Sequence, residues 1–207
     1  EHVGRYKEFA GEFVDNNFAV VGMDLRGHGK SEGLRGHMPS YHHVMEDIRI
    51  FIDKIMSEYD RDIILYGHSM GGNLVLNYVI RNNAPIKGVI ASAPWLKLAF
   101  TPPKPKIYLA KVMQNIWPRF SQKNEINIEK LCHDERVISD YKNDELVHDR
   151  ISAAMFYQIY QAGNYALTNA YKLDIPGLIM QGTADRITSI DASKKFANST
   201  KMCEFKS

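Results

Sequence analysis

The chain has 207 residues, of which 44% are hydrophobic and 24% are charged, and its mean hydropathy is −0.33. This size and composition predict one large α/β domain, or such a domain with an insertion. The 26 Lys and Arg nearly balance the 24 Asp and Glu, and the net charge of +2 argues against nucleic acid or an anionic membrane as the main partner. No apolar run approaches the length of a membrane span. The two cysteines, Cys132 and Cys203, match no metal-ligand spacing.

The first part of the chain alternates between helical and strand patterns. Residues 5–17 carry aromatic side chains at helical spacing, and residues 18–23 (FAVVGM) predict a short buried strand. The glycine-rich residues 24–36 predict a loop. Ser40 is placed to cap a helix whose apolar stripe runs through residues 44–59.

Residues 61–82 form the stretch around which the chain is organised. The apolar run at residues 63–66 predicts a strand, and it ends in the G-x-S-x-G pattern of Gly67–Gly71. A helical pattern follows directly, and residues 88–92 predict a further strand. Strands that alternate with helices predict a mostly parallel sheet with helices on both faces.

The glycines of this pattern predict a strained turn that exposes the hydroxyl of Ser69. A side chain at Gly67 or Gly71 would collide with the strand or the helix beside it. The helix that begins after Ser69 points unpaired N–H groups at the reacting centre. We therefore expect Ser69 to be a nucleophile and the backbone N–H of Met70 to be an oxyanion donor.

Residues 93–173 interrupt the alternation with two helical patterns, one near residues 108–113 and one at about 149–171, and with no credible strand. We interpret them as a helical cap, or lid, over the sheet. Its aromatic residues, Trp95 and Phe156 among them, either line an acyl-chain tunnel or pack the cap against the core. The core then comprises residues 1–92 and 174–207, and it resumes with a strand at 176–182, a helix at 190–198 and a strand at 202–207.

A serine nucleophile needs a base that is held by an acid, in the chain order Ser, Asp or Glu, His. Asp185 follows the strand at residues 176–182, so its loop faces the same sheet edge as Ser69. Asp174 precedes that strand, and Asp191 already enters a helix. The sequence favours Asp185 as the acid.

Four motifs in this order resemble the α/β-hydrolase superfamily, and within it the branch of monoacylglycerol lipases and lysophospholipases. They are EHVGRY at residues 1–6, DLRGHGKSEG at 24–33, LYGHSMGGN at 65–73 and QGTADRITS at 181–189. The resemblance implies an α/β-hydrolase fold with a helical cap insertion, a serine hydrolase activity and a small-molecule lipid ester substrate. A serine-based acyl transfer needs no metal and no cofactor.

Two parts of the family pattern are missing from this chain. The His-Gly pair that would supply the second oxyanion N–H belongs before Glu1, and no histidine follows Asp185. We assign the histidines that are present to structural or surface roles; they are His2, His28, His37, His42, His43, His68, His133 and His148. We therefore expect the chain to be a piece of a longer, active protein.

The resulting hypothesis is a serine hydrolase that cleaves carboxylic esters of lipids, monoacylglycerols or lysophospholipids, through an acyl-enzyme on Ser69. The alternatives are a non-catalytic relative that binds ligands, a short-chain esterase, and a haloperoxidase-like or C–C bond hydrolase. We expect transient contact of the cap with membranes or lipid droplets and a cytoplasmic or peripheral-membrane location. The oligomeric state is left open.

Overall fold

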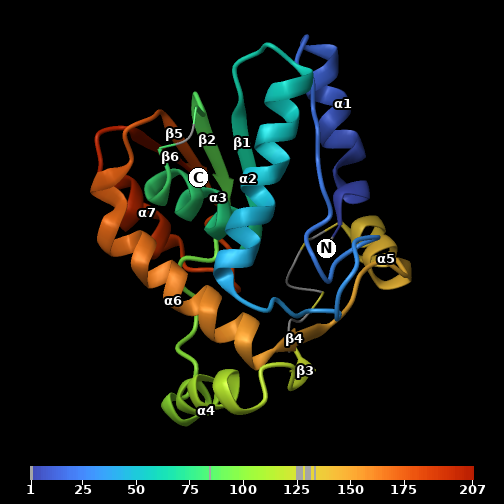
Figure 1. Ribbon diagram of the computed structural model, residues 1–207, viewed down its shortest axis with the longest axis vertical. Coiled ribbons are helices and arrows are strands. Elements are labelled where there is room, and N and C mark those ends of the chain that lie inside the picture. The colour runs from blue at the N-terminus through green and yellow to red at the C-terminus, as the bar shows by residue number, and fades with distance from the viewer. Residues whose placement is uncertain (1, 84, 125–127, 129–131, 133) are drawn as a thin grey trace.

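A four-stranded parallel sheet forms the centre of the computed structural model, which describes all residues except 1, 84, 125–127, 129–131 and 133 (Figure 1). Its strands are β1 (Ile64–His68), β2 (Gly88–Ser92), β5 (Gly177–Met180) and β6 (Cys203–Lys206), and they lie in the order β1-β2-β5-β6. Because every neighbouring pair is parallel, all four strands end at the same sheet edge. This edge receives the loops that follow β1, β2 and β5.

The hydrophobic core lies against one face of the sheet. Leu65 lies opposite Val89, and Ala91 lies opposite Ile179, and all four side chains are buried. They join one apolar cluster with α2 (Tyr41–Glu58), α3 (Met70–Arg81), α6 (Ala153–Asn169) and α7 (Ile190–Asn198). Successive strand residues point to opposite faces, so this cluster lies on one side of the sheet.

The other face is covered at β1 by α1 (Lys7–Asp15), which follows a 3₁₀ turn at Val3–Tyr6. The Tyr66 ring lies 4.6 Å from the Phe9 ring and 5.9 Å from the Tyr6 ring, centroid to centroid. Tyr66 is only half-buried, because a single short helix packs there.

The predicted strand at residues 18–23 is not paired in the structure, and that prediction was wrong. Phe18, Val20 and Val21 are 53%, 41% and 46% exposed. A strand exists only where a neighbour exchanges backbone hydrogen bonds with it. Although β1 is the end strand of the sheet, residues 18–23 form no ladder with it.

The segment between β2 and β5 is more varied than its sequence predicted. It contains α4 (Lys104–Ile116), α5 (Glu135–Asn143), α6 and a 3₁₀ turn at Ala170–Lys172. It also contains an antiparallel pair, β3 (Ser121–Lys123) with β4 (Arg150–Ser152), so the expectation of a strand-free segment was wrong. Three-residue strands are too short to show a period of two in the sequence. The division at residues 93 and 173 stays a prediction, since α6 shares the core cluster with the sheet.

Other expectations are confirmed. The Ser40 hydroxyl accepts the His43 N–H at the start of α2. The loop at residues 24–36 has positive φ at four glycines, which are Gly27, Gly29, Gly33 and Gly36. Within the described ranges, no helix combines the length and apolar character needed to cross a bilayer.

Candidate active site

Ser69 occupies a tight turn between β1 and α3. Its φ of 52° and ψ of −113° are conformations that a residue with a side chain rarely adopts. Three backbone hydrogen bonds hold it: the Ser69 N–H donates to the Ser92 carbonyl at 2.9 Å, and the Ser69 carbonyl accepts from the Trp95 N–H at 2.9 Å and the Asn73 N–H at 3.1 Å. The turn is thus tied to the end of β2 as well as to α3.

The hydroxyl of Ser69 is available for chemistry. The residue is half-buried, and among the described residues no hydrogen bond to its side chain is present. Ser69 directly precedes the first residue of α3, where backbone N–H groups have no partner within the helix. This places the Met70 N–H beside the serine, and its role as an oxyanion donor stays a prediction.

The glycines of the turn differ in how tightly they are packed. A Cβ on Gly67 would lie 2.3 Å from the Gly71 carbonyl oxygen and 2.8 Å from the Gly72 nitrogen. A Cβ on Gly72 would lie 2.9 Å from Pro94 Cα. A Cβ on Gly71 would meet nothing within 4 Å, so the predicted collision at Gly71 was wrong. The close approach of backbone segments requires glycine at positions 67 and 72.

Asp185 lies on the loop after β5, at the same sheet edge as Ser69. Its Oδ1 accepts the N–H groups of Ile187 at 2.7 Å and Thr188 at 3.0 Å. Its Oδ2 accepts from the Thr188 hydroxyl at 2.6 Å and from Gln181 Nε2 at 3.0 Å. These four donors fix the orientation of the carboxylate.

The loop that carries Asp185 is connected to the serine turn through the end of β2. The Thr188 side-chain oxygen lies 3.2 Å from the Ala93 carbonyl oxygen, and Ala93 follows Ser92, which binds Ser69. The sequence reasoning did not single out Thr188 or Gln181 individually, although both lie in QGTADRITS. Their closeness to Asp185 in the sequence is the feature from which their contact with the acid could have been predicted.

The two rival carboxylates lie elsewhere. Asp174 is exposed and precedes β5, at the opposite end of that strand. Asp191 is exposed in the first turn of α7. Of the three, Asp185 is the one that follows the end of a strand directly.

No imidazole among the described residues contacts the Asp185 carboxylate. The His68 Nδ1 lies 3.2 Å from the Ser92 hydroxyl, the His37 Nδ1 lies 2.9 Å from the buried Ser152 hydroxyl, and the His2 Nε2 lies 2.7 Å from Asp144 Oδ2. His42 and His43 begin α2, and His133 lies outside the described residues. The part of the chain described here therefore supplies a serine and an acid but no base between them.

The His28 and His148 rings pack against each other in a tilted arrangement, with centroids 4.8 Å apart. Burial lowers the pKa of His28 to about 4 and also lowers the pKa of His148. The His148 Nε2 lies 3.0 Å from the Gly27 carbonyl oxygen, so the pair joins the glycine-rich loop to the segment before β4. It serves as a structural contact.

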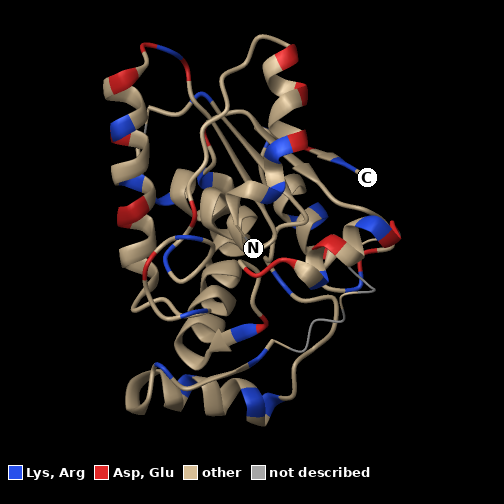
Figure 2. Cartoon of the chain, turned by 90° about the vertical axis from the view of Figure 1, so that its right-hand side faces the viewer, with Lys and Arg blue, Asp and Glu red and all other residues tan. Residues whose placement is uncertain are grey.

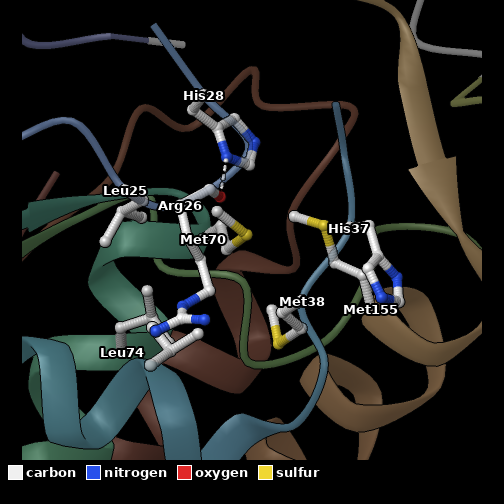
Figure 3. Close-up of a pocket in the computed structure, with 9 residues that line it drawn as sticks. Leu25, Arg26, His28, His37, Met38, Met70, Leu74 and Met155 are labelled. Atoms are coloured by element: carbon white, nitrogen blue, oxygen red, sulfur yellow. Dashed lines mark hydrogen bonds between the residues drawn. The ribbon is translucent and has the colours of Figure 1, made fainter. Parts of the chain in front are cut away.

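Figure 3 shows a small cavity beneath the serine turn, into which Met70 and His28 point. Its volume is about 10 Å³, which is at most the space of one water molecule. Arg26 lines it and forms a two-pronged ion pair with Asp47, at 2.5 and 2.6 Å. This cavity supports the turn and is too small for a substrate.

The two residues predicted to contact substrate lie side by side. The Trp95 and Phe156 rings are 6.2 Å apart, and both side chains are half-buried. The Trp95 N–H donates to the Ser69 carbonyl, so the Trp95 backbone lies next to the serine turn. Their role in substrate binding stays a prediction.

Within the described ranges, no group of three or more His, Cys, Asp or Glu side chains is arranged to hold a metal ion. Cys132 and Cys203 are both free. Burial raises the pKa of the Cys203 thiol to about 11, so it is protonated at neutral pH.

A protein-family model described as serine aminopeptidase, S33, matches residues 1–206. The chain belongs to this family. One relative is an uncharacterized abhydrolase domain-containing protein of Dictyostelium discoideum, 32% identical over 95% of this chain and 21% of its own length. Another is the phospholipase YtpA of Bacillus subtilis (strain 168), 30% identical over 90% of this chain and 73% of its own length.

A solved relative extends the comparison to three dimensions. The crystal structure of a Paleococcus ferrophilus monoacylglycerol lipase matches with a TM-score of 0.92 and 32% identity, over 99% of this chain and 79% of the lipase. The predicted α/β-hydrolase fold is confirmed. The family match and the similarity to a phospholipase and a monoacylglycerol lipase support a lipid ester hydrolase function, as the sequence predicted.

Proposed function

We propose that the protein containing this chain hydrolyses carboxylic esters of lipids, monoacylglycerols or lysophospholipids, through an acyl-enzyme on Ser69. The observation that carries the proposal is the turn at Ser69, whose positive φ aims an unpartnered hydroxyl at the sheet edge that also holds Asp185. The lipase and phospholipase relatives support the substrate class.

In the proposed mechanism the Ser69 oxygen attacks the ester carbonyl carbon while a histidine accepts its proton. No histidine among the described residues contacts the Asp185 carboxylate, so this base is not one of them. Asp185 holds it in the correct tautomer and stabilises its charged form. The oxyanion binds the Met70 N–H, the alcohol leaves, and water then releases the fatty acid.

Labelling of the full-length protein with a fluorophosphonate probe tests the nucleophile. Ser69→Ala should abolish labelling, whereas Ser57→Ala, on the exposed side of α2, should leave it unchanged. Asp185→Asn should lower kcat by about 10⁴-fold with little change in KM, because the base loses its orientation. Labelling that persists in Ser69→Ala would reject the assignment.

The acyl chain is proposed to pack on Trp95 and Phe156, next to the serine turn. Phe156→Ala should then lower kcat/KM for long-chain esters more than for acetyl esters, since only the long chain reaches this pair. A profile of wild-type activity that peaks at acetyl esters would instead favour the short-chain esterase.

Transient contact with a lipid surface is proposed for α4 and the residue that follows it. Ile116 and Trp117 are 75% and 58% exposed, and Lys104 and Lys111 lie on the same helix. Apolar side chains flanked by lysines are typical of helices that lie in a membrane interface. Trp117→Ser should weaken sedimentation with phosphatidylcholine vesicles, and Tyr171→Ser should not, although Tyr171 is 68% exposed and lies outside α4. The cytoplasmic or peripheral-membrane location stays a prediction.

A further inference from the structure

The side chain of Asn73 lies inside the protein, one helical turn after the serine. Its backbone N–H donates to the Ser69 carbonyl at 3.1 Å, at the start of α3. The residue is 0% exposed, so each polar atom of its amide needs a partner within the protein. Asparagine is also a weak helix former, because its side chain competes for backbone hydrogen bonds. The contacts of this amide therefore need an explanation.

The amide nitrogen of Asn73 donates to two carbonyl groups from different parts of the chain. It lies 2.8 Å from the Trp95 carbonyl oxygen, in the segment after β2, and 3.3 Å from the Ile159 carbonyl oxygen, in α6. The amide oxygen accepts the Tyr41 hydroxyl at 2.9 Å. Burial raises the pKa of the Tyr41 hydroxyl, so at neutral pH it keeps the proton that it donates. Because carbonyls only accept, these partners determine the orientation of the amide.

The two carbonyls belong to the segments that carry the aromatic pair near the serine. Trp95 is one member of the pair, and Ile159 lies about one helical turn after the other member, Phe156. The Trp95 N–H also donates to the Ser69 carbonyl at 2.9 Å. One residue, Asn73, thus contacts the serine turn, the Trp95 segment and the helix that carries Phe156.

The helix α6 approaches the segment after β2 at a second point, Gly163. A Cβ on Gly163 would lie 2.2 Å from the Leu96 carbonyl oxygen and 3.1 Å from Leu96 Cα. Charged residues gather on the outer elements of the molecule (Figure 2), whereas α6 contains no Lys, Arg, Asp or Glu. The place of α6 beside Trp95 therefore depends on close packing and on uncharged hydrogen bonds such as those of Asn73.

We propose that Asn73 is a positioning residue that determines acyl-chain specificity: its amide holds Trp95 and Phe156 where a long acyl chain attached to Ser69 can pack on them. This inference rests on the proposed ester hydrolysis. Asn73 touches no reacting atom and acts through the backbone of Trp95 and of α6. A long chain reaches the aromatic pair and an acetyl group does not, so the two substrates report on this role separately.

The first experiment compares Asn73→Leu with Asn77→Leu in the full-length protein. Asn77 is equally buried and donates to the Ala162 carbonyl of α6 at 3.1 Å, but no hydrogen bond joins it to Trp95 or Ile159. Both variants lose one buried amide, so both should unfold at lower urea concentrations than the wild type.

The deciding quantity is the ratio of kcat/KM for a long-chain ester to kcat/KM for an acetyl ester. Asn73→Leu should lower this ratio by about tenfold, the scale of discrimination in an apolar pocket, and Asn77→Leu should change it by less than about twofold. A merely structural role would lower both kcat/KM values by the same factor. An unchanged ratio in Asn73→Leu, or an equal fall in both variants, would overturn the proposal.

A second variant, Gly163→Ala, tests the same geometry without altering the amide. Its methyl group would push α6 away from Leu96, and the ratio should fall in the same direction. Gly11→Ala is the control, because a Cβ at this position of α1 meets nothing within 4 Å. A Gly163→Ala protein with the wild-type ratio would show that the place of α6 does not set the chain preference, which would reject the proposal.

Amide hydrogen exchange measures the contact itself and needs no substrate. Peptides that span Trp95 should exchange about tenfold faster in Asn73→Leu than in Asn77→Leu, because the Trp95 segment loses a hydrogen bond in the first variant alone. Equal exchange in the two variants would refute the positioning role. Failure of the hydrolase proposal would show differently, as a wild-type protein that turns over neither ester.

Discussion

The turn at Ser69 allows a matched pair of substitutions, Gly67→Ala and Gly71→Ala. The new methyl group on Gly67 would lie 2.3 Å from the Gly71 carbonyl oxygen, so the start of α3 must move by about 0.7 Å to restore a 3.0 Å contact. The new methyl group on Gly71 meets nothing within 4 Å. The two changes are chemically identical, and only their surroundings differ.

We expect Gly67→Ala to lower the free energy of unfolding by about 1–3 kcal/mol, the usual cost of overpacking. It should also lower kcat by about 10²-fold, because a displacement near 1 Å misplaces the nucleophile. Gly71→Ala should leave kcat nearly unchanged and raise stability by about 0.5–1 kcal/mol, since alanine favours a helix over glycine.

Urea unfolding followed by circular dichroism measures the free energy of unfolding. The rate of fluorophosphonate labelling measures the reactivity of Ser69. Equal destabilisation by the two substitutions would refute the packing argument. So would a Gly67→Ala protein that labels at the wild-type rate.

Three further changes test other contacts. Thr188→Val removes the hydroxyl 2.6 Å from Asp185 Oδ2 and should cost about 1–3 kcal/mol in urea unfolding, with a lower kcat; an unchanged protein would show that this bond does not position the acid. Asn77→Leu removes the buried side-chain amide that donates to the Ala162 carbonyl and should cost a similar amount, while exposed Asn82→Ala should cost less in the same assay. His28 has a folded pKa of about 4, lowered mainly by burial from 6.5, so the unfolded chain binds its proton first as the pH falls. Wild-type stability should therefore fall by about 3 kcal/mol more than that of His28→Gln between pH 7 and pH 4, and parallel unfolding curves would contradict this.

Most of the fold and the order of the candidate site residues could be predicted from the sequence. The strands β1, β2, β5 and β6 are short apolar runs next to helical patterns, and such local signals survive in any context. The acid could be predicted because Asp185 follows a strand whose end lies at the same sheet edge as Ser69, and the family resemblance agrees with this choice. The base could not be identified, since no histidine of the chain contacts this carboxylate among the described residues.

The wrong predictions about strands have one cause in common. Residues 18–23 have the composition of a buried strand, yet they are exposed and unpaired, because a strand depends on a neighbour that its own sequence does not specify. The pair β3 and β4 joins residues about thirty positions apart through three-residue segments, which carry no periodic signal.

The sequence by itself determined the turn at Ser69 and the glycine-rich loop at residues 24–36, because the steric limits on φ and ψ act within a few residues. Only the tertiary structure decided that Gly72 rather than Gly71 is packed against Pro94, and that the Asn73 amide joins Trp95 to α6. The physical reason is distance along the chain: close packing and hydrogen bonds act between atoms that folding brings together, whatever their separation in sequence.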